Sequence, residues 1–245
     1  MKALILNSGL GSRMGAVASE HPKCMTEIGP CDTILSRQLR QLAAAGIEDV
    51  VMTTGYQDAV LTAYCRGLRL PLRFTFVKNP VYDRTNYIYS IYCAREYLDD
   101  DILLMHGDLV FEDEVLERVA ASPVSCMTVS STLPLPEKDF KARLADGKVM
   151  AIGVDIFDDA VEAQALYHLY RKDWKMWLDR IIEFCERGNV KVYAENALNE
   201  LGGAANIHAL DVKDLLCAEI DNNEDLAAVT AGLREIEARR LQPDR

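Results

Sequence analysis

Apolar and polar positions follow two different periods along the first half of the chain. Short apolar runs at 3–6 and 49–54 have the length and the side chains of buried strands. Between them, residues 33–46 place four apolar side chains on one face of a helix, namely Ile34, Leu35, Leu39 and Leu42. A helix at 57–66 and a strand at 73–77 repeat the alternation. This order of elements predicts a sheet of parallel strands.

The alternation continues to a strand that ends in an acidic residue. The Asn79-Pro80 pair predicts a turn, residues 87–97 a helix, and residues 101–105 a buried strand that runs into His106-Gly107-Asp108. We therefore expect an α/β fold with a Rossmann-like, mixed and mainly parallel sheet that is flanked by helices.

The second half of the chain has a less regular pattern. A turn is expected at Gly202-Gly203. The other expected elements are strands at 125–131 and 148–157, a loop at 134–138, a helix at 160–187, a short strand at 191–194 and a terminal helix from 223 to about 239.

The length of 245 residues suits one large α/β domain or a domain with a modest insertion. We expect a single domain over 1–245, with a first half at 1–115, a second half at 116–222, and a C-terminal helix and tail at 223–245. The tail at 241–245 is expected to fray, or to be the cut end of a longer polypeptide. In that case a further catalytic domain, such as an aminotransferase, would follow it.

Composition and charge narrow the class of protein. Hydrophobic residues make up 49% and charged residues 27%, as in ordinary globular proteins. The net charge of -11 argues against broad affinity for nucleic acid or for an anionic membrane. No apolar run approaches the ~20 residues that span a bilayer, and no cleavage site follows the N-terminus, so we expect a cytoplasmic protein. The seven scattered cysteines are expected to be reduced thiols in or near the core.

The first candidate for chemistry is the loop Leu6-Asn7-Ser8-Gly9-Leu10-Gly11-Ser12-Arg13-Met14, which follows the first strand. Its glycines let the backbone approach phosphate oxygens, while Arg13 and the later Lys23 supply cationic donors. The loop lacks the Gly-Lys-Ser/Thr of a Walker loop and the third glycine of a dinucleotide fingerprint. A structural turn with surface charges is the alternative interpretation.

The second candidate is a set of acids expected at the edge where parallel strands end. Asp108 ends a strand, and ligands of open α/β sheets bind at that edge. In the segment Glu219-Ile220-Asp221, an extended backbone would place both acids on one face. Such carboxylates suit Mg²⁺, which prefers oxygen ligands. For Asp221, a solvated acid or a cap of the terminal helix is the alternative.

The order of these motifs resembles the nucleotidyltransferase family that includes sugar-phosphate nucleotidyltransferases and bacterial phosphocholine cytidylyltransferases. The N-terminal signature is LNSGLGSRMGAVASEHPKCMTEIG, with Asn7-Ser8 in place of the usual alanine pair. The segment 79–90 looks like the Asn-Ile-Tyr-Ser region of the phosphocholine and 2-aminoethylphosphonate cytidylyltransferases. The resemblance implies a GT-A-like nucleotidyltransferase fold with a smaller acceptor-binding subdomain, and CTP as the nucleotide.

The resemblance also implies a role for several residues. Arg13 would hold the β- and γ-phosphates, and Lys23 the α-phosphate. The magnesium cofactor would be held by Asp108 and Asp221, with Glu219 as a further candidate. Thr85 and Asn86 would lie near the cytosine. The nucleotide site implied in full is Leu6, Asn7, Ser8, Gly9, Gly11, Ser12, Arg13, Lys23, Thr85, Asn86 and Asp108, of which Arg13, Lys23 and Asp108 would be catalytic.

The acceptor site is expected in the second half of the chain. Aromatic faces and a carboxylate could hold a cationic headgroup. The candidates are Tyr167, Trp174, Trp177, Tyr193, Glu195 and Asn196. For Trp174 and Trp177, packing in the core is the alternative. The stretches HGDLVF and AENALNEL look more like those of the phosphonate-activating relatives. This resemblance implies 2-aminoethylphosphonate rather than phosphocholine as the acceptor.

We therefore expect CMP transfer from CTP to a small aminoalkyl phosphonate or phosphate, with release of pyrophosphate. The acceptor dianion is already a nucleophile, so no general base is required, and a base role for His106 is a weaker hypothesis. Phosphocholine transfer, sugar-1-phosphate transfer and an inactive nucleotide-binding regulatory module remain as alternatives. A homodimer is compatible with the sequence.

Overall fold

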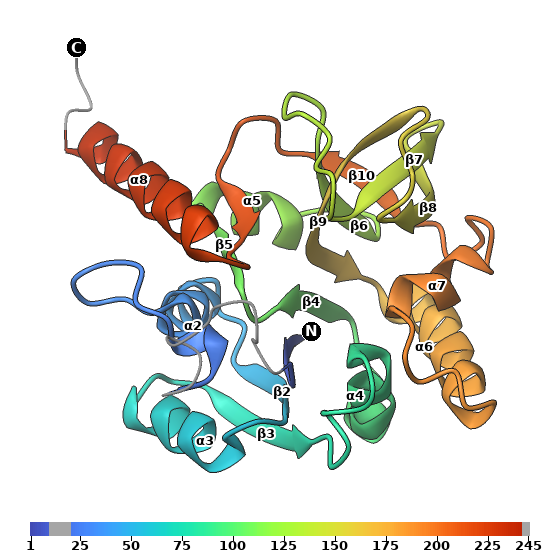
Figure 1. Cartoon of the computed structure of the whole chain (residues 1–245), viewed down its shortest axis with the longest axis horizontal. Coiled ribbons are helices and arrows are strands. Elements are labelled where there is room, and N and C mark those ends of the chain that lie inside the picture. Colours follow the sequence, from blue (N-terminus) through green and yellow to red (C-terminus); the bar gives the residue numbers. More distant parts are fainter. Residues whose placement is uncertain (10–20, 242–245) are drawn as a thin grey trace.

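The chain folds around one large mixed sheet with helices on both faces (Figure 1). The computed structural model describes residues 1–9 and 21–241. The strands of the large sheet are β1 (Lys2–Asn7), β2 (Asp49–Thr54), β3 (Arg73–Lys78), β4 (Ile102–His106), β6 (Cys126–Ser130), β7 (Lys141–Ala145), β8 (Lys148–Gly153), β9 (Ala160–Leu169) and β10 (His208–Asp211). They lie in the order β3-β2-β1-β4-β9-β6-β10-β8-β7. A separate pair consists of β5 (Leu109–Phe111) and β11 (Cys217–Glu219).

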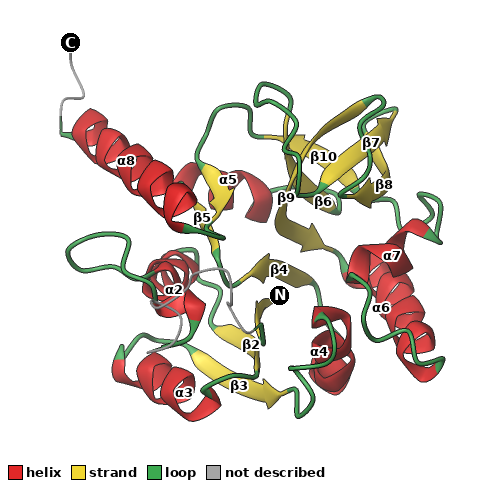
Figure 2. Ribbon diagram, in the orientation of Figure 1, coloured by secondary structure: helices red, strands yellow, loops and turns green. Residues whose placement is uncertain are grey.

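Alternate side chains of β1 enter two different hydrophobic clusters, so this strand must be covered on both faces. Leu4 packs in a cluster with one group of helices, and Ile5 packs in a cluster with the other group. Figure 2 shows the helices on either side of the strands. The first group is α4 (Tyr87–Ala94), α6 (Arg171–Glu186) and α7 (Ala194–Asn199); the second is α2 (Ile34–Ala44), α3 (Asp58–Gly67) and α5 (Asp113–Ala120).

The parallel part of the sheet confirms the strand and helix alternation expected for the first half. β3, β2, β1 and β4 are neighbours, and each pair is parallel. Their carboxyl ends therefore meet at one edge of the sheet. Beyond β4 the sheet is mainly antiparallel, because β9 pairs antiparallel with β4 and β6, and only β10 and β6 are parallel there.

The expected helix at 160–187 is wrong in its first part. Residues 160–169 form β9, and a helix begins only at Arg171. The sequence AVEAQALYHL is rich in residues that favour helices, but it fills the gap between β4 and β6, where strand pairing outweighs the local preference. Of the helix expected at 87–97, residues 87–94 form α4 and residues 95–97 form a 3-10 turn.

The expected strand at 191–194 is also wrong, since α7 begins at Ala194 with Tyr193 as its N-cap. The strand expected at 148–157 ends at Gly153. Five elements were not expected, namely β5, α5, β7, β10 and β11. The four strands among them are too short for a clear period, whereas α5 does bury Val115, Leu116 and Val119 at helical spacing. The terminal helix is confirmed as α8 (Asn223–Arg240), which leads away from the body of the molecule in Figure 1.

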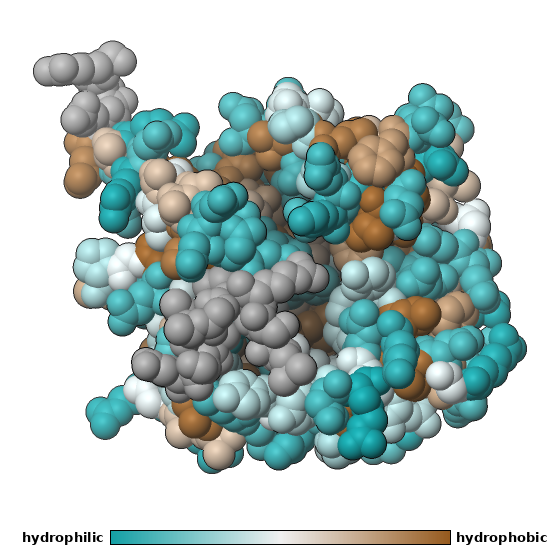
Figure 3. Space-filling model, viewed as in Figure 1, coloured by the Kyte–Doolittle hydropathy of each residue, from teal (hydrophilic) through white to brown (hydrophobic). Residues whose placement is uncertain are grey.

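Hydrophilic side chains cover most of the face seen in Figure 3. Five of the seven cysteines are buried, Cys93 is half-buried and Cys31 is exposed, and all seven are free. Among the described residues, no helix combines the length and the apolar composition that crossing a membrane requires.

Two tryptophans of α6 form the largest buried side chains of the core. Trp174 and Trp177 are 1% and 0% exposed, and their rings pack edge to face with centroids 5.7 Å apart. The Trp174 indole donates to the Leu98 carbonyl at 2.9 Å, and the Trp177 indole donates to the Ala194 carbonyl at 2.8 Å. Both indole N–H groups are therefore used to join α6 to its neighbours.

Replacing Trp177 by Phe should destabilise the fold by roughly 2 kcal/mol, because it removes buried volume and a buried hydrogen bond. Urea unfolding followed by circular dichroism measures the free energy of unfolding. The exposed Tyr97, changed to Phe, is the control and should stay within about 0.5 kcal/mol of the parent. An unchanged free energy of unfolding for the Trp177 variant would contradict its place in the core.

Glu162 is a half-buried acid in the middle of the antiparallel part of the sheet. It lies on β9, opposite Ser130 of β6 and Lys141 of β7. Burial, and then the charge of Asp139, raise the pKa of its carboxyl to about 7. The folded state therefore holds this proton more tightly than the unfolded state does. Stability linked to it is complete below the ordinary glutamate pKa and is lost as the pH rises through about 7.

Replacing Glu162 by Gln removes this titration. The difference in unfolding free energy between variant and parent should shift in favour of the variant by about 1 kcal/mol when the pH rises from 4.5 to 8.5. The shift is this small because solvent partly screens the Glu162 charge. Urea unfolding at the two pH values measures the difference. An equal effect of the substitution at both pH values would contradict the raised pKa.

Candidate active site

A cavity of about 460 Å³ opens at the edge where the parallel strands end. The loop after β1 and the turn after β4 form its floor, as expected for a ligand site of an α/β sheet. The lining residues that carry the argument below are Asn7, Ser8, Lys23, Thr85, Asn86, Tyr87, His106, Asp108, Asp139, Phe140, Tyr193, Glu219 and Asp221.

The small sheet of β5 and β11 brings Glu219 and Asp221 to the end of β4. Glu219 of β11 pairs with Leu109 of β5, and the next amide, Ile220 N–H, donates to the Asp108 carbonyl at 3.1 Å. Asp221 follows immediately, before the N-cap Asn222 of α8. The antiparallel ladder therefore fixes the position of the backbone from Glu219 to Asp221 relative to Asp108.

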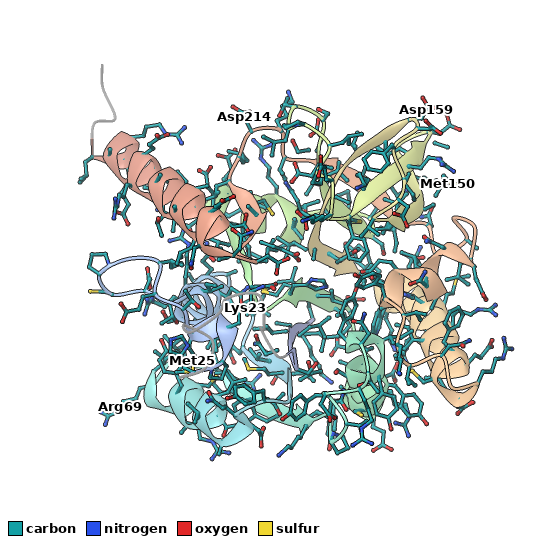
Figure 4. All side chains as sticks on the ribbon, viewed as in Figure 1. Lys23, Met25, Arg69, Met150, Asp159 and Asp214 are labelled. Atoms are coloured by element: carbon teal, nitrogen blue, oxygen red, sulfur yellow. The ribbon has the colours of Figure 1, made fainter. Side chains whose placement is uncertain are left out.

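Lys23 lies between two carboxylates. Its ammonium donates to Asp108 Oδ2 at 2.6 Å and to Asp221 Oδ1 at 2.5 Å, although the latter is 198 positions away in the chain. Figure 4 shows Lys23 near the middle of the view, whereas Arg69 and Asp159 lie at the periphery. Burial alone would lower the pKa of Lys23, but the two carboxylates raise it. Burial would raise the pKa of Asp108, but Lys23 and His106 lower it.

A second ion pair lies beside the first. His106 Nδ1 is 2.7 Å from Glu219 Oε1. Burial alone would lower the pKa of His106, but the Glu219 carboxylate raises it to about 9. The Glu219 carboxylate therefore favours the protonated imidazole, which argues against His106 as a general base. Burial, and then the charge of Asp108, raise the pKa of the Glu219 carboxyl in turn.

Gly107 lies in the turn after β4, close to the last residues of β1. A Cβ at this position would lie 1.7 Å from Asn7 Oδ1 and 2.9 Å from the Leu6 carbonyl oxygen. The Gly107 amide donates to that carbonyl at 3.1 Å. Only glycine allows the turn after β4 to approach the end of β1 so closely.

Thr85 and Asn86 line the cavity and also stabilise the loop before α4. The Asn79 side-chain amide donates to Thr85 Oγ1 at 2.9 Å and to Ser90 Oγ at 3.0 Å. The Asn86 side chain caps α4 by accepting from the backbone N–H of Tyr87. Ser90 Oγ in turn lies 2.6 Å from Ser8 Oγ. The loop after β1 is thus joined to the Asn-Ile-Tyr-Ser region.

The predicted nucleotide and metal residues that the structure describes all line this cavity. They are Leu6, Asn7, Ser8, Gly9, Lys23, Thr85, Asn86, Asp108, Glu219 and Asp221. Gly11, Ser12 and Arg13 lie outside the described residues.

Most of the predicted acceptor residues do not line the cavity, and Tyr193 is the exception. Trp174 and Trp177 are core residues, because their rings and N–H groups are already used inside the fold. Tyr167 and Glu195 are 0% and 1% exposed. Asn196 is exposed at the start of α7, where its side chain accepts from the Tyr193 amide at 3.0 Å, and the cavity lining does not include it.

Glu195 is a buried acid that contacts a residue of the cavity wall. It accepts a short hydrogen bond from the Tyr87 hydroxyl and another from the Tyr167 hydroxyl at 3.1 Å. Burial, and then the charge of Glu195, raise the pKa of both tyrosines well above the ordinary value. Tyr87 lines the cavity, so Glu195 holds one of its walls in place.

Aromatic rings continue from this point across the cavity. The Tyr87 ring lies 4.9 Å from the His106 ring and 5.9 Å from the Tyr193 ring, and Phe140 packs edge to face on Tyr193 at 4.9 Å. Of these, the sequence pointed only to Tyr193 as an acceptor candidate. Phe140, with Lys138 and Asp139 beside it, comes from the loop between β6 and β7, which has no periodic pattern and so gave no signal.

The carboxylates at the cavity fit a divalent cation. Asp108 and Asp221 already hold one positive charge between their oxygens, on Lys23. A carboxylate oxygen of Glu219 lies within 4.8 Å of one of Asp108. A set dominated by carboxylate oxygens matches the preference of Mg²⁺.

Comparison with known proteins identifies the family of the chain. A family described as MobA-like NTP transferase domain matches residues 3–132, more than half of the chain. A CMP-5'-(3-aminopropyl)phosphonate synthase of Streptomyces rubellomurinus is 30% identical over 240 residues, which cover 92% of this chain and 37% of that protein. A CTP:phosphoglutamine cytidylyltransferase of Campylobacter jejuni is 26% identical over 158 residues, 61% of each chain. The chain thus spans between 37% and 61% of the length of these two relatives.

The fold is shared with solved structures. CTP:phosphocholine cytidylyltransferase of Streptococcus pneumoniae superposes with a TM-score of 0.75 and 19% identity, over 95% of this chain and 98% of that one. The mixed α/β nucleotidyltransferase fold expected from the sequence is therefore confirmed. The chain belongs to the MobA-like NTP transferase domain family.

Proposed function

We propose that the protein transfers CMP from CTP to a small aminoalkyl phosphonate or phosphate and releases pyrophosphate, with 2-aminoethylphosphonate as the preferred acceptor. The observation that carries this proposal is the position of Lys23 between Asp108 and Asp221, at one end of a cavity whose other wall is aromatic and acidic. One cavity thus offers charges suited to a triphosphate and a surface suited to a cationic headgroup.

The triphosphate side is assigned to the loop after β1 and to the charged cluster. Lys23 would contact the α-phosphate, and Arg13 the β- and γ-phosphates. Asp108 and Asp221, with Glu219, would hold Mg²⁺. When bound, the metal neutralises phosphate charge and favours departure of pyrophosphate.

The chain's own contribution to the reaction is to position the reactants. One acceptor oxygen attacks the α-phosphorus, the bond to the β-phosphate oxygen breaks, and that electron pair leaves with pyrophosphate. Lys23 offsets the charge that develops on the α-phosphate oxygens. No proton has to be removed from a dianionic acceptor, which accords with a His106 that already carries its proton.

The acceptor side is assigned to the wall that contains Asp139, Phe140 and Tyr193. An ammonium group is attracted both by aromatic faces and by a carboxylate. The names of the relatives support small phosphorylated or phosphonylated acceptors, because one is an aminopropylphosphonate synthase and another a phosphoglutamine cytidylyltransferase. Neither name decides between a phosphonate and a phosphate for this chain.

Pyrophosphate release with Mg²⁺ tests the proposal. CTP, UTP, ATP and GTP should each be combined with 2-aminoethylphosphonate, 3-aminopropylphosphonate, phosphocholine, phosphoethanolamine and glucose-1-phosphate. The proposal predicts turnover with CTP and an aminoalkyl phosphonate or phosphate, fastest with 2-aminoethylphosphonate. Preference for glucose-1-phosphate would contradict the acceptor, and the absence of turnover in every combination would favour an inactive module.

The variant Asp108→Asn tests the metal site, and Asp113→Asn is its matched control. Asp108→Asn keeps the volume of the side chain and removes its charge, so kcat should fall by about 10²- to 10³-fold. The variant Asp113→Asn changes an acid on α5 that does not line the cavity, and it should keep the parental rate. A parental rate for Asp108→Asn would exclude its proposed role.

A further inference from the structure

Lys141 is a buried lysine at the start of β7. Its side chain is 0% exposed, and it is among the largest side chains with so little exposure. Within the described part of the chain, no carboxylate lies within 4.0 Å of its ammonium, although Glu162 faces it in the strand register. Burying an ammonium is costly unless other groups replace the lost water. The contacts that replace this water therefore show what the residue does.

The ammonium is held by the backbone of one loop and by the ring of another. Lys141 Nζ donates to the Pro136 carbonyl at 2.7 Å, and the Glu137 carbonyl lies at 3.4 Å. The Phe157 ring centroid is 4.2 Å from Nζ, a distance typical of a cation–π contact. Pro136 and Glu137 belong to the loop between β6 and β7, and Phe157 to the loop between β8 and β9.

Both of these loops form part of the cavity wall. The loop between β6 and β7 supplies Lys138, Asp139 and Phe140, and the loop between β8 and β9 supplies Val154. The strands β7 and β8 form a hairpin next to these loops in Figure 1. One buried side chain, which does not itself line the cavity, thus connects the two loops that face the proposed acceptor.

The ends of the loop between β6 and β7 are fixed by the sheet. Ser130 Oγ accepts from the Leu133 amide at 3.1 Å, and the Phe140 carbonyl accepts from the Ala163 amide at 3.1 Å. Lys141 reaches Pro136 and Glu137, between these two anchors. A flexible middle would let Asp139 move relative to Tyr193, and recognition by a mobile wall loses free energy to ordering.

We propose that Lys141 is a positioning residue that fixes the distance between the reacting phosphorus and the wall that receives the amine, so that it sets the chain length of the acceptor. This inference rests on the proposed function. The residue has to be cationic, because an apolar side chain of the same size fills the space but cannot hold two carbonyls and attract a ring. Arginine keeps donors and charge, and so preserves part of the effect.

Kinetics with a homologous series of acceptors test the role. The series is aminomethyl-, 2-aminoethyl- and 3-aminopropylphosphonate, with CTP and Mg²⁺. For Lys141→Met, the acceptor KM should rise about tenfold, because the loop that faces the acceptor then has to be ordered when the acceptor binds. The ratio of kcat/KM between the best and the next acceptor should fall several-fold, while the KM for CTP stays within about twofold, because the triphosphate contacts lie on other loops.

Three further variants make the result interpretable. Lys141→Arg should restore much of the acceptor selectivity. Phe157→Ala removes only the ring contact from a side chain that is 52% exposed, so it should fold normally and shift the same ratio in the same direction, by less. Lys175→Met removes an exposed lysine of α6 and should change none of these values.

Hydrogen–deuterium exchange gives a readout that does not depend on any substrate. In Lys141→Met, amides at 137–140 should exchange faster than in the parent, while those of β1 and β4 should not change. Faster exchange with unchanged acceptor selectivity would make Lys141 a purely structural residue and would overturn the inference. An equal rise in the KM for CTP and for the acceptor would do the same, as would unchanged exchange. If no acceptor reacts with the parent, the proposed function fails instead, and the exchange result still decides whether Lys141 holds the loop.

Discussion

Two carboxylates with one ammonium between them are the constraint on which the rest of the site depends. Asp108 and Asp221 both contact the Lys23 ammonium, whose charge offsets the repulsion between the two carboxylates. The short ladder of β5 and β11 supplies the geometry, because it ties the backbone before Asp221 to the Asp108 carbonyl. Charge and register together thus bring three distant segments of the chain to one point.

The continuous sheet explains how one cavity can serve two reactants. β9 lies between β4 of the parallel part and β6 of the antiparallel part, so the two walls of the cavity belong to a single framework. From His106, the aromatic rings of Tyr87 and Tyr193 lead across the cavity to Phe140. Glu195 fixes Tyr87 from below. A phosphate group at the charged end and a headgroup at the aromatic end would therefore be held at a set separation.

The charged end of the site could be predicted from the sequence, and the aromatic end could not. Strand ends in a parallel sheet meet at one edge, so a lysine after the first loop and an acid after β4 could be placed together from the order of elements alone. Trp174 and Trp177 show the limit of that reasoning. Their type suits a cationic ligand, but only the packing of α6 reveals that both rings are buried. The loop that contains Phe140 has no period, so its position depends on tertiary contacts such as those of Lys141.

The segment that forms β9 illustrates the same limit for the fold. Its composition favours a helix, and only its two neighbouring strands turn it into the strand that joins both halves of the sheet.

The central claim, that the Asp108–Asp221 pair is the cation site of a cytidylyltransferase, has a direct test. Crystals should be grown with Mn²⁺ and a non-hydrolysable CTP analogue, and the anomalous signal of the metal located. The account predicts a manganese peak in contact with Asp108 and Asp221, with Lys23 Nζ moved to the α-phosphate. A peak elsewhere, or Lys23 still between the two carboxylates, would contradict it.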